Sequence, residues 1–147
     1  MAVKRVGFNN ILIPVTGTEA DNEAMKLACR LLDKKGKGSI CAVCIIAIAR
    51  TLPLDAEVEP EINKAENILT HMESVAKEQG FGIETDLLQA RNISSAIIEE
   101  AEERKTDVII IGVEYHTRFG EFNLGKVVTY VLKNAPCRVI IYHQQAK

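Results

Sequence analysis

The apolar residues of this chain alternate along its length between the spacing of strands and the spacing of helices. Short runs rich in β-branched residues predict five strands, at Asn10–Val15, Ser39–Ile46, Ile83–Leu88, Asp107–Ile111 and Arg138–Tyr142. Apolar stripes three and four residues apart predict helices between them: one that follows Thr18, one over Glu61–Gln79, one that starts near Ser94 and one over Gly125–Asn134. Such an alternation indicates an α/β fold.

Two of the predicted helices begin with residues that suit a cap. Thr18 is followed three residues later by Asp21, which makes a variant of the capping box. Ser94 or Ser95 can cap the third helix, and Asn92 offers an alternative start. The buried side of the fourth helix is expected to consist of Val127, Val128, Val131 and Leu132.

The order of the elements restricts the topology. Parallel strands joined by right-handed helical crossovers allow few arrangements, and we expect an open, doubly wound parallel sheet of five strands in the order 3-2-1-4-5, with helices on both faces. Ligands of such sheets bind beyond the carboxyl ends of the strands, where the strand order reverses. Here that point lies between strands one and four, so residues 14–17 and 112–126 matter most.

Composition agrees with a globular domain and excludes several classes of partner. With 147 residues, 47% hydrophobic and 26% charged, we expect one domain over 1–147 with an ordered core over about 8–143. Lys and Arg number 18 against 20 Asp and Glu, which argues against nucleic acid as a partner. The longest apolar run, Ile40–Ala49, is about half of the roughly 20 residues that a membrane span needs. A soluble, cytoplasmic protein without direct membrane insertion is the prediction.

The four cysteines are expected to be small core residues. Cys41 and Cys44 have the spacing of a redox or metal pair, but side chains three apart on a strand point to opposite faces. Two such thiols cannot readily hold one ion, so no metal site is predicted.

The segment between the fourth strand and the fourth helix carries the candidate chemistry. Free N–H groups at a helix start favour a phosphate, Gly125 lets the backbone approach a ligand, and Lys126 adds a positive charge. Alternatively, Gly112 and Gly125 merely permit turns and close helix–sheet contact. Residues 120–126 fit the start of a Walker A pattern, but Val127 stands where a hydroxyl should hold magnesium, which argues against a P-loop NTPase.

Two stretches make the chain similar to a known family. The opening ILIPVTGTEADNEAMKLA and the closing IIIGVEYHTRFGEFNLGKVVTYVLKNAPCRVII resemble the first and last parts of universal stress proteins, and VLKNAPCRVII is the strongest piece. The ending is also similar to stress-protein domains appended to some amino-acid transporters. The resemblance implies a homodimer and a stress-response or regulatory role, and it leaves a transporter partner open.

Members of that family that bind ATP carry the pattern G-x-x-G-x9-G-[S/T] in this loop. Here the pattern is degenerate: Tyr115 replaces the second glycine, Lys126 replaces the hydroxyl residue, and Thr16 stands where an Asp usually contacts the ribose. The resemblance implies ATP or another adenine nucleotide as the ligand, with Mg²⁺ only as its companion. It places the nucleotide beside Pro14, Thr16, Ile46, Gly112, Val113, Tyr115, His116, Gly125, Lys126 and Val127.

Two functions of different classes follow. The first is a non-catalytic module that binds an adenine nucleotide and responds to it. The second is an interaction module without a ligand, which acts through dimer contacts of the last strand or through a transporter partner. Slow ATP hydrolysis is a weaker third reading, because no group that could activate water is evident.

Overall fold

The computed structural model describes residues 7–33, 38–115 and 125–145. Five strands lie within these ranges: β1 Asn10–Pro14, β2 Ser39–Ala47, β3 Glu84–Ala90, β4 Val108–Tyr115 and β5 Arg138–Gln145. The helices that connect them are α1 Glu19–Leu31, α2 Glu59–Glu78, α3 Ile93–Glu103 and α4 Lys126–Asn134. The predicted alternation of strands and helices is confirmed.

The strands form one parallel sheet in the order β3-β2-β1-β4-β5, as the sequence predicts. β1 lies between β2 and β4, and its register pairs Ile11 with Val108 and Leu12 with Ile109. The strand order therefore reverses between β1 and β4. Beyond the carboxyl ends of these two strands lies the place where open α/β sheets bind ligands.

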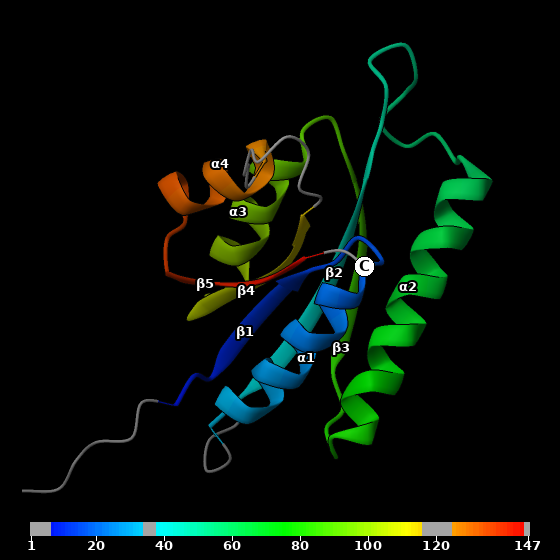
Figure 1. The fold of residues 1–147 in the computed structure, drawn as a ribbon. Helices are drawn as coiled ribbons and strands as arrows, with labels where there is room; N and C mark the ends of the chain where they lie inside the picture. The colour runs from blue at the N-terminus through cyan, green and yellow to red at the C-terminus, as the bar shows by residue number, and fades with distance from the viewer. Residues whose placement is uncertain (1–6, 34–37, 116–124, 146–147) are drawn as a thin grey trace, which may run out of the picture.

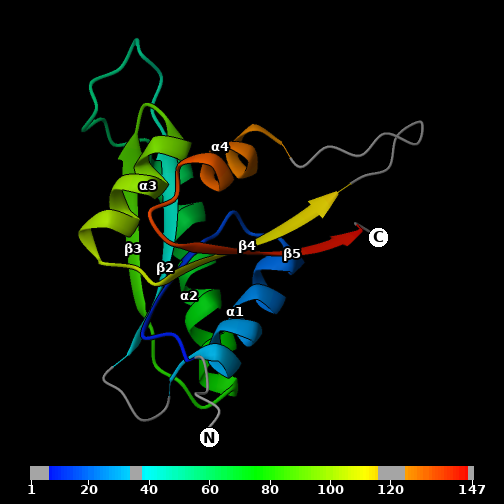
Figure 2. The same cartoon turned by 90° about the vertical axis from the view of Figure 1, so that its left-hand side faces the viewer.

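Helices cover both faces of the sheet (Figure 1). α1 and α2 pack on one face and α3 and α4 on the other, and the view turned by 90° shows the two helical layers on opposite sides of the strands (Figure 2). Side chains of β1 alternate between the layers, since Ile11 and Ile13 belong to the α1/α2 core and Leu12 to the α3/α4 core. Burial on both faces explains the continuous apolar runs of the central strands.

Local capping sets where two helices begin. Thr18 caps α1 and forms the predicted capping box with Asp21. α3 uses the alternative start, because Asn92 rather than Ser94 or Ser95 is its N-cap and accepts from the Ser95 N–H at 3.0 Å.

The last two strands extend further than the sequence predicts. β4 continues past Gly112 to Tyr115 because β5 continues beside it, with Gly112 paired to Tyr142 and Tyr115 to Gln145. Figure 2 shows these paired ends extending away from the rest of the sheet. The prediction that the fourth strand ends at Gly112 is therefore wrong: residues 112–115 belong to the strand.

A second correction concerns α4. Val128 and Val131 are buried as predicted and Val127 is half-buried, but Leu132 is 49% exposed. Residue 132 lies one turn beyond Val128, at the edge of the buried stripe, so helical spacing alone does not decide whether it is covered. None of the helices in the described ranges has the length and hydropathy that a membrane crossing requires.

Candidate functional site

The structure places three of the predicted site residues on β1 and β2 or just after them. Pro14 is the last residue of β1 and is half-buried, and Thr16 lies exposed in the turn to α1. Ile46 lies in β2 with its side chain 8% exposed, in the core beneath α1 and α2. Pro14 and Thr16 therefore lie at the surface of the carboxyl edge, which is the edge of the sheet where the carboxyl ends of its strands lie. The Ile46 side chain contributes instead to the core.

The β4 part of the site is shaped by close packing. A Cβ at Gly112 would lie 2.3 Å from the Ala20 carbonyl oxygen and 2.9 Å from the Asp21 nitrogen, so this glycine is needed for contact with α1. Val113 points to the other face and packs against the α3/α4 core. Tyr115 ends β4, while its side chain and the whole of His116 lie outside the described residues.

The amino end of α4 combines features that favour an anion. Gly125 is its N-cap with φ 86°, and among the described residues no side chain caps the helix and no atom lies within 4 Å of the position a Cβ would take. Lys126, the first residue of the helix, is exposed. An accessible, positively charged helix start is suited to hold one phosphate.

The turn between β1 and α1 is closed by a buried carboxyl group. Asp21 is 1% exposed, and its Oδ2 accepts from the backbone N–H groups of Thr16, Gly17 and Thr18 at 3.0, 2.7 and 3.0 Å. Burial raises the pKa of Asp21, and the hydrogen bonds from this turn only partly oppose that effect. The capping pattern identified Asp21 in the sequence, but nothing in the pattern indicated that it also binds Thr16 and Gly17.

A second carboxylate occupies the start of α1. Glu114 Oε1 accepts from the backbone N–H groups of Glu19 at 2.9 Å and Ala20 at 3.3 Å. The sequence analysis missed Glu114 because the contact requires β4 to run past Gly112. The positive end of the α1 helix dipole is thus stabilised by a carboxylate of the protein itself.

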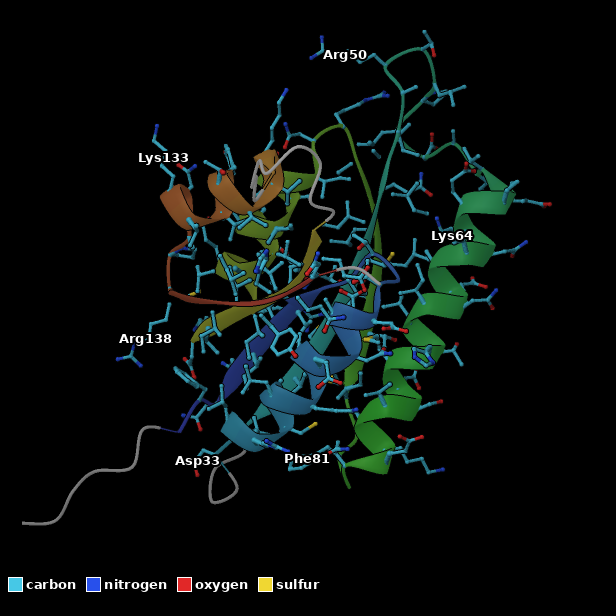
Figure 3. The ribbon with its side chains drawn as sticks, viewed as in Figure 1. Asp33, Arg50, Lys64, Phe81, Lys133 and Arg138 are labelled. Carbon is cyan, nitrogen blue, oxygen red and sulfur yellow. The ribbon has the colours of Figure 1, made fainter. Side chains whose placement is uncertain are left out.

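A hollow of about 540 Å³ opens between α1 and α2 on one face of the molecule. Its walls combine polar and apolar side chains, among them Lys64 of α2, which is labelled in Figure 3. Its lining is Gly17, Thr18, Glu19, Asn22, Pro60, Asn63, Lys64, Asn67, Ile68, His71 and Met72. The hollow borders the turn after β1 but contains none of the predicted site residues, so it gives no support to the start of α4 as a site.

Three of the four cysteines are buried as the sequence predicts, and Cys137 is only partly buried against the α3/α4 core. Cys41 and Cys44 belong to the cores on opposite faces of the sheet. Burial raises the pKa of Cys41 to about 12, so its thiol stays protonated. Among the described residues, no group of three or more His, Cys, Asp or Glu side chains could hold a metal ion.

Comparisons with known proteins agree on one family. The model of the Universal stress protein family matches residues 7–143. A universal stress protein of Methanocaldococcus jannaschii is 27% identical over 146 residues, which cover 95% of this chain and 85% of the relative.

Solved structures show the same fold. The universal stress protein of Archaeoglobus fulgidus in complex with dAMP superposes with a TM-score of 0.70 at 18% identity, covering 90% of this chain and 96% of the other. A family protein of Arabidopsis thaliana with AMP bound gives a TM-score of 0.63 at 14% identity, covering 94% and 93%. At these identities the structures establish the architecture.

Proposed function

This chain belongs to the universal stress protein family, and from that premise we propose that it is a regulatory domain that binds an adenine nucleotide without converting it. The ligand lies beyond the carboxyl ends of β1 and β4, with a phosphate at the start of α4. The base and ribose lie toward Pro14 and Thr16, whose hydroxyl group is exposed to a ligand. Two of the related structures have dAMP and AMP bound, which supports this ligand class.

The amino end of α4 is the observation that carries the proposal. Among the described residues no side chain caps it, its N-cap Gly125 is exposed and has a positive φ, and Lys126 follows at once. Lys126 replaces the neutral hydroxyl of the family pattern with a charged donor, and charged donors hold phosphate more strongly. The degenerate pattern therefore keeps the means to bind an anion.

For the nucleotide we propose a role as a signal and not as a substrate. Glu114, a carboxylate at the carboxyl end of β4, accepts through Oε1 from two backbone N–H groups of α1. This contact gives Glu114 a structural role at the start of α1, which supports a binding function for this edge of the sheet.

Thermal unfolding with and without ligand tests the proposal. We expect millimolar AMP, ATP or cyclic AMP to raise the melting temperature, because a ligand that binds only the folded state stabilises it. Lys126→Ala should weaken the affinity about tenfold by removing one charged contact. Lys133→Ala is the matched control, since Lys133 lies in the last turn of the same helix and points away from the sheet (Figure 3).

The outcomes separate the parts of this proposal. No stabilisation by any of the three nucleotides would contradict nucleotide binding as a whole. An equal loss of nucleotide affinity in Lys126→Ala and Lys133→Ala would contradict only the proposed position of the phosphate at the start of α4.

A second candidate function is a dimeric interaction module. β5 forms the edge of the sheet and pairs with β4 alone among the described strands, and its apolar residues 139–142 are only half-buried. Exposed edge strands of this kind are usually covered by another chain. We propose a homodimer that pairs through β5; a transporter is the alternative partner.

A further inference from the structure

We propose that the hollow between α1 and α2 is a second ligand site, which takes a free α-amino acid with an uncharged side chain. Its volume of about 540 Å³ lies in the range of about 300–1,000 Å³ that small-molecule pockets have. The lining contains none of the residues proposed to hold the nucleotide, so the inference does not rest on the proposed function.

The α1 wall of the hollow presents hydrogen-bond acceptors. Glu19 and Asn22 are neighbours one turn apart on this helix, and both line the hollow. Asn22 Oδ1 is buried, and it has no hydrogen-bond partner among the described residues. A buried acceptor without a donor is costly, and the terminal torsion of an asparagine is soft enough to turn this oxygen toward a ligand. The α1 wall therefore suits a group that donates, such as an ammonium group.

The backbone of the same wall is not available to an anion. The N–H groups of Glu19 and Ala20 donate to Glu114, and those of residues 16–18 donate to Asp21. These two carboxylates satisfy the donors that usually attract an anion to the start of a helix. A carboxylate or phosphate group of a ligand would gain no hydrogen bond from these N–H groups.

The α2 wall presents donors instead. Lys64, labelled in Figure 3, lines the hollow together with Asn63 and Asn67. No carboxylate of the described residues forms an ion pair with Lys64, so its ammonium group can pair with a carboxylate of a ligand. Each of the two amide groups adds N–H donors. The α2 wall therefore suits the carboxylate end of a small molecule.

Charge and apolar surface restrict the ligand further. Glu19 and Lys64 are the charged side chains of the lining when His71 is neutral, and their charges cancel. This balance favours a molecule without net charge that carries one positive and one negative group. Ile68 and Met72 pack in the α1/α2 core and give the hollow an apolar surface for an uncharged side chain. An α-amino acid zwitterion combines these properties.

Calorimetric titration of the whole chain with L-leucine and L-methionine tests the site. We expect both to bind with dissociation constants of about 1 mM or below. N-acetyl-L-leucine lacks the ammonium group and L-leucinamide lacks the carboxylate. Each of these derivatives should bind about tenfold more weakly than leucine, because each loses one charged contact.

Variants of the two walls assign each contact. Lys64→Gln should weaken leucine about tenfold and leave leucinamide within about twofold, because leucinamide has no carboxylate to lose. Glu19→Gln should weaken leucine equally and leave N-acetyl-leucine within about twofold. Lys77→Gln and Glu78→Gln, exposed changes in the last turn of α2, are the matched controls and should leave the affinity for leucine unaltered. Melting temperatures without ligand verify that all four variants are folded.

The outcomes test the ligand class and the location separately. Failure of both leucine and methionine to bind at millimolar concentrations would overturn the proposed site. Equal affinities for leucine and its two derivatives would exclude recognition of a zwitterion. An equal loss of leucine affinity in all four variants would exclude the location between α1 and α2. None of these results bears on the nucleotide, which is proposed to bind at the start of α4.

Discussion

Gly112 shows how one residue decides the spacing between β4 and α1. Both the sequence pattern and the resemblance marked it as a ligand-binding glycine, with close helix–sheet contact as the alternative. In the structure its missing side chain faces the backbone of Ala20 and Asp21. This contact lets α1 begin against β4, and it brings the first N–H groups of α1 within reach of Glu114. The packing role is therefore present whether or not a ligand also uses this glycine.

Gly112→Ala is expected to destabilise the protein by about 1–3 kcal/mol, the usual cost of overpacking a well-filled region. The new Cβ would lie 2.3 Å from a carbonyl oxygen of the backbone, which cannot turn away as a flexible side chain can. Urea unfolding measures the change. Gly82→Ala is the matched control, because nothing lies within 4 Å of its Cβ position, and a change within about 0.5 kcal/mol is expected there. A similar decrease in the free energy of unfolding for Gly112→Ala and Gly82→Ala would contradict the proposed packing role of Gly112.

At the scale of elements, the turn from β1 into α1 is the most constrained part of the carboxyl edge. A single buried side chain, Asp21, binds three consecutive N–H groups and completes the capping box of Thr18. Burial nevertheless raises the pKa of Asp21, because the loss of water around the carboxylate outweighs these hydrogen bonds. The turn is therefore expected to be sensitive to pH.

The direction of that sensitivity follows from linkage. A raised pKa means that the folded protein holds the Asp21 proton more tightly than the unfolded chain does. The stability that this difference in proton binding provides is fully present below about pH 4, the ordinary pKa of aspartate. It is lost as the pH rises through the raised pKa of Asp21 in the folded protein. The free energy of unfolding of the unaltered protein minus that of Asp21→Asn should therefore fall with increasing pH above about pH 4.

Urea unfolding of both proteins between pH 4 and neutrality measures this difference. Asp55→Asn, in the exposed loop before α2, controls for the loss of a carboxyl group elsewhere. A difference that grows with pH would show that hydrogen bonding to the carboxylate outweighs its burial.

At the scale of the whole molecule, the edge strand β5 is the surface on which we expect a second copy to bind. The strand lies at the edge of the sheet, its residues 139–142 are half-buried, and its far end extends beyond the helices with β4 (Figure 2). A second copy that pairs edge to edge would bury this strand and continue the sheet.

Light scattering after size-exclusion chromatography should give a mass near twice 16.2 kDa. Tyr142→Lys should shift the protein to the monomer, because a lysine on an edge strand opposes pairing with another strand. Tyr130→Lys removes an exposed tyrosine of α4 and should leave the mass unchanged. A monomer mass for the unaltered chain at tens of micromolar would contradict a stable dimer through β5.

The sequence by itself determined the order of the elements and the strand order, because the two hydrophobic spacings and the rules of parallel crossovers act over short stretches. It also predicts an anion-binding helix start at Gly125 and Lys126, since that chemistry needs only neighbouring residues. The extension of β4, the exposure of Leu132 and the contacts of Glu114 with α1 depended on tertiary structure. Each of these is set by partners far away in the chain, such as Gln145 beside Tyr115, and no local pattern encodes such a partner.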